Sequence, residues 1–179
     1  DDMIDLRGKI ADYADDNTNT APSADDYTDA GVANVTSANL DEINALIAAL
    51  GAGEADTAQK VQTIVNAPAT VSSVAITSAT GALNSRLNKG DEVEITVTMN
   101  RSVVVSTEGG TPKLALTIGT ATVYADYVST SGSAMVFKYT VLAEQTDVNG
   151  ISLGANALDL NGGTIQTTVV GTAATVTHD

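Results

Sequence analysis

The chain has 179 residues and a net charge of −14, with 43% hydrophobic residues, 3% aromatic residues and no cysteine. This length and apolar content allow one large or two small domains with an aliphatic core, and they exclude a disordered tail. The acidity disfavours nucleic-acid and anionic-membrane partners, and the absence of cysteine excludes disulfides and thiol chemistry.

The chain starts with Asp1-Asp2-Met3, which lacks the basic and apolar regions of a secretory signal. No apolar run reaches the roughly 18 residues that a membrane-spanning helix needs. We therefore expect an excerpt of a longer polypeptide, with any export signal outside it and no membrane insertion.

Residues 1–67 are acidic and show helical periodicity. They hold 13 acidic and 3 basic residues, and apolar residues recur at steps of three and four. The pattern predicts a module of three to four short helices, one of them a short helix over 23–30 that ends at Gly31. The other apolar stripes are Met3, Leu6, Ile10 and Tyr13; Leu40, Ile43, Leu46, Ile47 and Leu50; and Val61, Ile64 and Val65.

Capping residues accompany two of these helices. Ser37 precedes the second stripe as an expected N-cap, and Gly51 follows its end as an expected C′ glycine. Asp56 and Gln59 have the spacing of a capping box for the last helix. None of these helices is long enough to be stable alone, so they are expected to pack together or on the rest of the chain.

Strand periodicity replaces helical periodicity after Pro68, which disfavours helix at the residue before it. Apolar and polar residues alternate with the period of two that marks antiparallel sheets, and the turns carry Gly, Asn and Asp. The predicted fold class is α+β by segments: a helical module over 1–67, then an all-β immunoglobulin-like antiparallel sandwich over 68–179. The expected strands cover 71–78, 92–99, 102–106, 114–118, 121–128, 135–141, 150–153 and 173–178.

The second part also resembles a known family. An ordered series of motifs over 87–98, 112–119, 125–128, 137–141, 146–151 and 155–165 includes Leu87-Asn88-Lys89-Gly90-Asp91 and Asn161-Gly162-Gly163-Thr164-Ile165. This series is similar to the immunoglobulin-like repeat named for a swimming-motility cell-surface protein, which occurs in giant bacterial surface proteins, RTX-type adhesins included. Residues 25–32 and 40–50 resemble a helical insert of such proteins.

The resemblance implies a non-enzymatic extender segment of a large secreted adhesin, located extracellularly on the bacterial cell surface. Its partners would be neighbouring repeats of the same polypeptide, with a host or biofilm ligand bound through other domains. Two alternatives stay open: a protein- or glycan-binding module, and a subunit of a self-assembling surface layer or filament. Neither nucleic acid nor a membrane is an expected partner.

A candidate calcium loop lies over residues 15–26. Asp15, Asn17 and Asn19 occupy positions 1, 3 and 5 of a twelve-residue loop, with Ser23 at position 9 and Asp26 at position 12. Oxygen ligands at alternate positions, closed by a carboxylate, are what Ca²⁺ prefers. The loop departs from the motif at its sixth and eighth positions, and the alternative interpretation is an Asx-rich turn with Ser23 as a helix N-cap.

A second candidate calcium cluster lies at one end of the predicted sandwich. Asp147 and Asn149 could supply carboxylate and amide oxygens there, and repeats of the resembling adhesins often carry Ca²⁺ at such ends. The alternative is a plain turn, because Asn-Gly is a strong hairpin signal. The acidic residues that could join the cluster from other loops are Asp91, Glu92, Asp126 and Asp159.

Catalytic chemistry has little support in this sequence. His178 is the only histidine and reads as a surface residue at a strand end, so a catalytic triad or a histidine-rich zinc site is not expected. Glu92 and Glu94 alternate with core positions on one strand, which indicates a solvated sheet face rather than a glycosidase pair.

Overall fold

A computed structural model describes residues 2–83, 86–145 and 150–179, and for the first helix it describes side chains from Gly8 onward. The chain forms two compact units. The first comprises residues 1–67 together with 168–172, and the second comprises residues 68–167 together with 173–179. The structure differs from the expected division in the segment 168–172, which belongs to the helical unit although it lies near the end of the chain.

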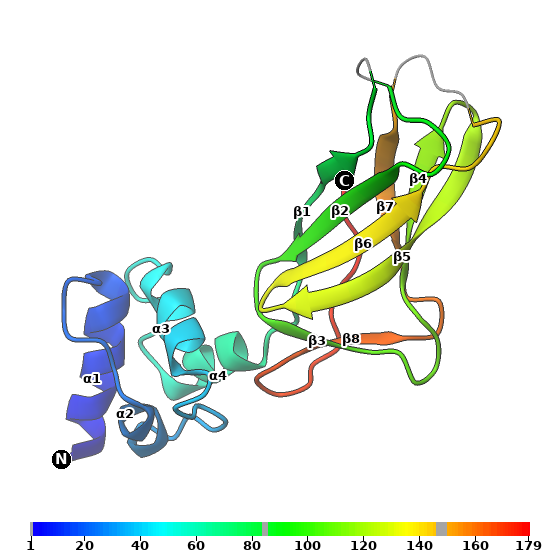
Figure 1. The fold of residues 1–179 in the computed structure, drawn as a ribbon. Coiled ribbons are helices and arrows are strands. Elements are labelled where there is room, and N and C mark those ends of the chain that lie inside the picture. Colours follow the sequence, from blue (N-terminus) through cyan, green and yellow to red (C-terminus); the bar gives the residue numbers. More distant parts are fainter. Residues whose placement is uncertain (1, 84–85, 146–149) are drawn as a thin grey trace. The chain divides into compact units, whose positions relative to one another are not determined.

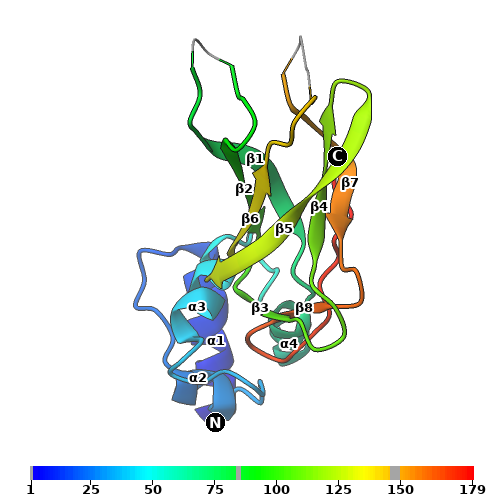
Figure 2. The same ribbon diagram turned by 45° about the vertical axis from the view of Figure 1, so that its right-hand side comes forward.

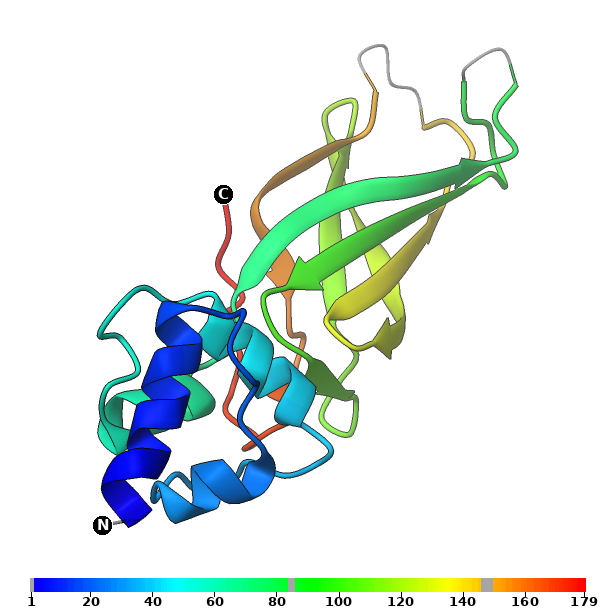
Figure 3. The same cartoon turned by 90° about the vertical axis from the view of Figure 1, so that its left-hand side faces the viewer.

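Four helices form the first unit within the described residues: α1 (Asp2–Asp15), α2 (Ala24–Asp29), α3 (Leu40–Ala48) and α4 (Ala58–Asn66) (Figure 3). The described members of their apolar stripes meet in one core, as the periodicity predicts. Met3 and Leu6 of the first stripe lie outside the side chains that the structure describes. The buried members of this core are Ile10, Ala14, Tyr27, Ala30, Val32, Val35, Ile43, Ile47, Ala55, Val61 and Val65.

The helix ends follow the predictions only in part. Gly31 adopts a φ of 82° directly after the C-cap of α2, as a C′ glycine does. The N-cap of α3 is Asn39, without a side-chain cap, so the expectation for Ser37 is wrong. Helix α3 has its C-cap at Ala49, which places Gly51 beyond the C′ position and corrects that prediction as well.

The N-cap of α4 also lies one residue after Asp56, the expected first residue of the capping box. Thr57 is the N-cap, and its hydroxyl accepts a hydrogen bond from the backbone N–H of Lys60. Asp56 instead pairs with the Lys60 ammonium at 2.7 Å. Threonine and aspartate both cap helices well. The sequence therefore located the start of α4 but assigned the N-cap to Asp56, whereas the neighbouring Thr57 has that role.

The segment 168–172 completes the helical unit. Val169 and Val170 are partly buried and pack against the helical core. The Thr172 hydroxyl donates to the carbonyl oxygen of Asn66 at 3.2 Å. The chain therefore passes from one unit to the other three times, after residues 67, 167 and 172.

The second unit contains a six-stranded antiparallel sheet, in the order β1-β2-β6-β5-β4-β7, and a two-stranded sheet of β3 and β8 (Figures 1 and 2). The large sheet is curled, and β1 and β7 are its two edges. The strands are β1 (Val71–Thr80), β2 (Glu92–Met99), β3 (Val103–Ser106), β4 (Lys113–Ile118), β5 (Ala121–Ser131), β6 (Ala134–Thr140), β7 (Ser152–Asp159) and β8 (Thr164–Thr167).

The alternating residues place one face of each central strand in the core. Val93, Ile95, Val97 and Met99 of β2 are at most 2% exposed, whereas the residues between them are accessible to solvent. The rings of Tyr127 and Phe137 meet edge to face, with centroids 5.8 Å apart. The predicted fold class is confirmed: a helical module is followed by an antiparallel β-sandwich.

The final segment of the chain differs from its prediction. Residues 173–178 were expected to form a strand, but they form an extended segment with single bridges instead of a continuous ladder. Strand β8 was not predicted, and β7 extends to Asp159, well beyond the expected end at residue 153. None of the helices in the described ranges is long and apolar enough to cross a membrane.

Candidate functional site

The candidate calcium loop places Ser23 and Asp26 together as a helix cap. Ser23 is the N-cap of α2, and its hydroxyl accepts a hydrogen bond from the Asp26 backbone N–H at 3.3 Å. The Asp26 carboxylate in turn accepts from the backbone N–H and the hydroxyl of Ser23, at 2.7 and 2.8 Å. This reciprocal capping box confirms the alternative interpretation of Ser23.

Asp26 also pairs with the ammonium group of Lys9 from α1. The Asp26 side chain is 13% exposed, so burial acts to raise its pKa. The hydrogen bonds from Lys9 and Ser23 outweigh that effect, and the pKa lies below its ordinary value. The carboxylate is therefore charged at neutral pH and ties α1 to the start of α2.

The other members of the loop have separate partners. Asp15 accepts a hydrogen bond from the Gly53 backbone N–H at 3.2 Å. The Asn19 amide donates to the carbonyl oxygen of Asp12 at 3.0 Å, and Asn17 is exposed. In this arrangement Lys9 and Ser23 occupy one oxygen of the Asp26 carboxylate, the group that would close a twelve-residue calcium loop. Calcium binding at this loop stays a prediction.

The second candidate cluster lies partly outside the described residues, since Asp147 and Asn149 are not among them. The acidic residues that could join them have their own partners. Asp126 lies 3.7 Å from Lys113, and Glu92 lies 3.8 Å from Lys138. Among the residues that the structure describes, no three His, Cys, Asp or Glu side chains are grouped so that they could hold a metal ion.

The carboxylates of Asp91 and Asp159 each accept a hydrogen bond within a local turn of the backbone. Asp91 accepts a hydrogen bond from the Asn88 backbone N–H at 2.6 Å. Asp159 accepts one from the Asn161 backbone N–H at 2.8 Å. Both are local contacts that close a turn, a common role of aspartate side chains.

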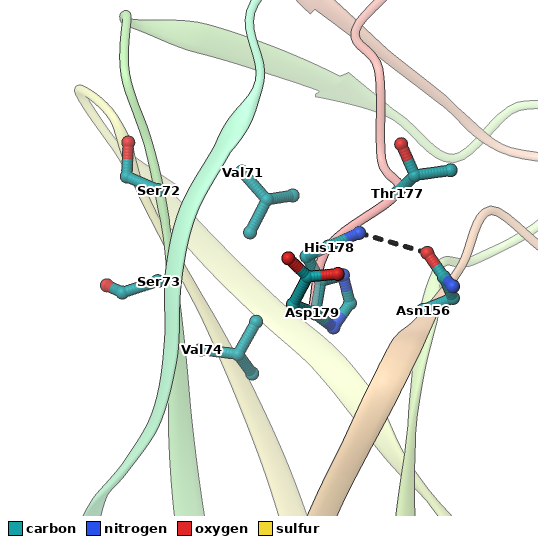
Figure 4. A pocket seen from close by; sticks show the side chains of 8 residues that line it. All are labelled: Val71, Ser72, Ser73, Val74, Asn156, Thr177, His178 and Asp179. Carbon is teal, nitrogen blue, oxygen red and sulfur yellow. Dashed lines mark hydrogen bonds between the residues drawn. The ribbon is translucent and has the colours of Figure 1, made fainter.

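A groove between the two edges of the large sheet is the feature that the sequence did not reveal (Figure 4). It has a volume of about 590 Å³ and lies between the start of β1 and Asn156 of β7. The side chains of Val71 and Val74 point toward it, whereas Ser72 and Ser73 point away. The last residues of the chain, Thr177, His178 and Asp179, form part of its lining.

His178 joins the last segment of the chain to β7 through its backbone and its ring. Its N–H donates to the Asn156 side-chain oxygen at 3.0 Å, and its carbonyl accepts from the Asn156 N–H at 2.9 Å. Ring Nε2 accepts from the Ala157 N–H at 3.2 Å, so the proton of the neutral ring lies on Nδ1, 3.1 Å from the Val176 carbonyl. His178 is thus half-buried and fully engaged, which corrects its expected role as a surface residue.

The same segment joins β1 on its other side. Thr70 and Thr175 form a parallel bridge, and the Thr175 N–H donates to the Ala69 carbonyl at 2.8 Å. Residues 173–179 alternate between exposed and half-buried, and Ala174 and Val176 pack against the core of the sandwich. The segment therefore connects the two edges of the curled sheet.

Comparison of the chain with protein-family models, curated proteins and solved structures finds no match.

Proposed function

We propose that the chain is a non-enzymatic extender segment of a large secreted bacterial surface adhesin. In this role it holds more distant parts of the polypeptide away from the cell and bears tension along its length. The proposal builds on the motif series that resembles adhesin repeats. The parallel pairing of the first and last segments of the sandwich unit is the observation that carries it.

That pairing determines how the sandwich unit responds to a pull. Thr70, next to the start of β1, pairs in parallel with Thr175, near the last residue, Asp179. When residue 68 and residue 179 are pulled apart, two parallel neighbours slide past each other. The hydrogen bond from the Thr175 N–H to the Ala69 carbonyl and the apolar contacts of the segment are then loaded together, because shear does not open them one by one.

The core behind this pairing supports the same role. Ala174 and Val176 of the last segment pack against the apolar cluster that includes Val93, Ile95 and Phe137 of the central strands. Withdrawing the segment would expose Ala174, Val176 and the part of the cluster that they cover to water, at a cost of roughly 25 cal/mol for each Å² of apolar surface exposed. The sandwich unit thus opposes extension through both packing and hydrogen bonds.

Single-molecule force measurement tests the proposal. The chain contains no cysteine, so pairs of introduced cysteines can attach handles at chosen points. Handles at Pro68 and Asp179 load the parallel pair in shear. Handles at Asn88 and Asp179 lie toward the same end of the pair, because β1 runs from Val71 to Thr80, and they peel the last segment away.

We expect the shear arrangement to unfold at clearly higher force than the peeling arrangement, since forced unfolding reports the unfolding rate along the pulled direction. Equal and low forces in both arrangements would contradict the extender proposal. The thermal stability of both cysteine variants, measured without handles, controls for damage to the fold.

A further inference from the structure

The turn between β7 and β8 is built on Asn161 and Gly162. Asn161 has a φ of 46° and Gly162 a φ of 85°, and the Gly163 N–H donates to the Leu160 carbonyl at 2.7 Å. Positive φ at both central residues is typical of a tight turn for which Asn-Gly is a preferred sequence. Asn161 is exposed to solvent, so water reaches this turn.

An asparagine followed by glycine can react with its own backbone, because glycine has no side chain to hinder the approach. The backbone nitrogen of the glycine attacks Cγ of the asparagine and forms a C–N bond that closes a succinimide ring. The Cγ–Nδ2 bond breaks, and ammonia leaves with the proton of the attacking N–H. Water then adds to either ring carbonyl and opens the ring to aspartate or isoaspartate. No reactant other than water is needed, so the local geometry decides whether this deamidation occurs.

Asn161 is held in a conformation that opposes this reaction. Its backbone N–H donates to the Asp159 carboxylate at 2.8 Å, and its side-chain amide donates to the Thr111 carbonyl at 2.9 Å. The attack requires the side chain to leave Thr111 and to turn onto the Gly162 nitrogen. It also requires the peptide group between Asn161 and Gly162 to rotate.

The turn after β3 opposes that rotation, because its backbone lies against the backbone of Asn161 and Gly162. A Cβ atom at Gly110 would overlap the Asn161 carbonyl oxygen, which belongs to the peptide group that must rotate. A Cβ atom at Gly162 would lie 2.5 Å from the Gly109 carbonyl oxygen, and one at Gly109 would overlap the Gly162 carbonyl oxygen. We call this backbone contact of Gly109 and Gly110 with Asn161 and Gly162 the glycine contact.

We propose that Asn161 is a deamidation site whose reaction the glycine contact controls. Asn161 keeps its amide while the two turns touch and loses it when they separate. Parts of a folded protein open locally without global unfolding, so such separation is possible in the folded chain. The reaction depends only on this turn and on water, and it is independent of the extender role.

The product of the reaction does not restore the original turn. An aspartate at position 161 only accepts hydrogen bonds, so it would face the Thr111 carbonyl without a donor. It would also bring a second carboxylate close to Asp159, whose side chain lies beside the backbone nitrogen of residue 161. Isoaspartate adds a backbone atom to a turn that has no space for one. Opening of the glycine contact therefore leaves a permanent chemical mark.

Peptide mapping by mass spectrometry tests the proposal. The folded chain and a synthetic peptide of residues 158–166 are incubated in the same buffer, and conversion of Asn161 is followed in both. We expect conversion in the folded chain to be at least about tenfold slower, because reaction from an open state scales with the population of that state. Equal rates in the chain and the peptide would overturn the proposal, and so would failure of the peptide to convert.

A pair of glycine variants separates the glycine contact from general stability. Gly109→Ala places a methyl group against the Gly162 carbonyl oxygen, and the φ of Gly109 lies outside the left-handed region, so alanine is not otherwise strained there. Gly132→Ala is the matched control. Gly132 has a φ of 58° and no atom within 4 Å of an added Cβ, so its variant is strained at a distance from the contact.

We expect Gly109→Ala to accelerate the loss of the Asn161 amide by about tenfold under native conditions, and Gly132→Ala to leave the rate close to that of the unaltered chain. Equal rates in the two variants would overturn the controlling role of the contact. The comparison of the folded chain with the peptide needs no variant, so it decides the proposal even if Gly109→Ala does not fold. Asn161→Asp reproduces one product and should lower the melting temperature of the sandwich unit, and an unchanged melting temperature would overturn the permanence of the mark.

Discussion

Gly110 lies directly against the backbone of Asn161: a methyl group at Gly110 would lie 1.9 Å from the Asn161 carbonyl oxygen. The turn after β3 and the turn after β7 therefore interlock through their backbones. The Asn161 amide adds a hydrogen bond to the Thr111 carbonyl at 2.9 Å. Only glycine allows this approach, and Gly110 also has a φ of 153°.

We predict that Gly110→Ala lowers the free energy of unfolding of the sandwich unit by at least about 3 kcal/mol, because backbone atoms would have to move. Gly132→Ala is the matched control. Gly132 has a φ of 58° with no atom in the way, so its variant should lose only about 1–2 kcal/mol. Denaturant unfolding followed by the β-sheet signal measures both, and equal losses would contradict the interlock.

Tyr27 gives a prediction for the helical core. It is fully buried, and its hydroxyl donates to the Asn44 side-chain oxygen at 2.6 Å, while the Asn44 amide donates to the Pro22 carbonyl at 2.9 Å. Tyr27→Phe leaves the Asn44 oxygen buried without its donor, at a cost of about 1–3 kcal/mol. Unfolding followed by the helical signal tests this, and Tyr124→Phe at an exposed position of β5 should have no such effect.

The same tyrosine makes the helical unit sensitive to alkali. Burial, followed by the nearby Tyr13 and Asp26, raises the pKa of Tyr27 well above its ordinary value. An unfolded tyrosine ionises near pH 10, so this stabilisation is complete below about pH 10 and is lost as pH rises further. The helical unit should therefore weaken above about pH 10, and Tyr27→Phe should show a smaller alkaline loss; an unchanged loss would contradict this origin.

Asp26 gives the opposite pH dependence. Its lowered pKa means that its stabilisation is present above the unfolded value of about 3.9 and is lost as pH falls through the lower folded value. We predict that Asp26→Asn destabilises the helical unit by about 1 kcal/mol at neutral pH and reduces its loss on acidification. Asp25→Asn, at an exposed neighbour in the same turn, is the control, and equal acid profiles in both variants would refute the prediction.

The segment 168–172 should matter to helices that lie a hundred residues earlier in the chain. Replacing Val169 and Val170 by Ser removes apolar contacts from the helical core and should cost about 1–3 kcal/mol of its stability. The helical signal at 222 nm during thermal unfolding reports this loss. Val104→Ser, at a half-exposed valine of β3, should change stability by less than about 0.5 kcal/mol.

If the chain binds calcium at residues 15–26 or at the sandwich end, its melting temperature in excess Ca²⁺ should be several degrees higher than in chelator. Mg²⁺ should have no such effect. Asp15→Ala should abolish the increase if the loop binds the ion, and Asp147→Ala should abolish it if the sandwich end does. Equal melting in Ca²⁺ and chelator would contradict both sites and leave a metal-free spacer.

The elements predicted best from the sequence are those marked by a regular pattern of neighbouring residues. Strand β2 alternates apolar and polar residues without interruption, and its observed bounds are those expected. Strand β8 has only four residues, and its pairing of Thr167 with Val103 spans more than sixty residues, so no local pattern could reveal it. The same holds for Val169 and Val170, which read as part of a β-rich region but pack in the helical unit.

The candidate sites also divide into contacts between neighbouring residues, which the sequence indicated, and contacts between distant residues, which it did not. The capping role of Ser23 depends on residues three apart, and the sequence indicated it. The pairing of Asp26 with Lys9 joins two helices, and the segment of residues 173–179 contacts two strand edges. Such contacts depend on the tertiary arrangement, which periodicity and motif spacing do not contain.

The three passages of the chain between the units have a consequence for its synthesis. Residues 1–67 leave the ribosome before the sandwich strands do, but the core they form is also packed by Val169 and Val170. The helical unit therefore stays incomplete while residues 68–167 are translated, and its core closes only when Val169 and Val170 emerge. Domains usually fold in the order in which they are made, but here neither unit is complete until residues 168–179 have been translated, so the two units are expected to mature together.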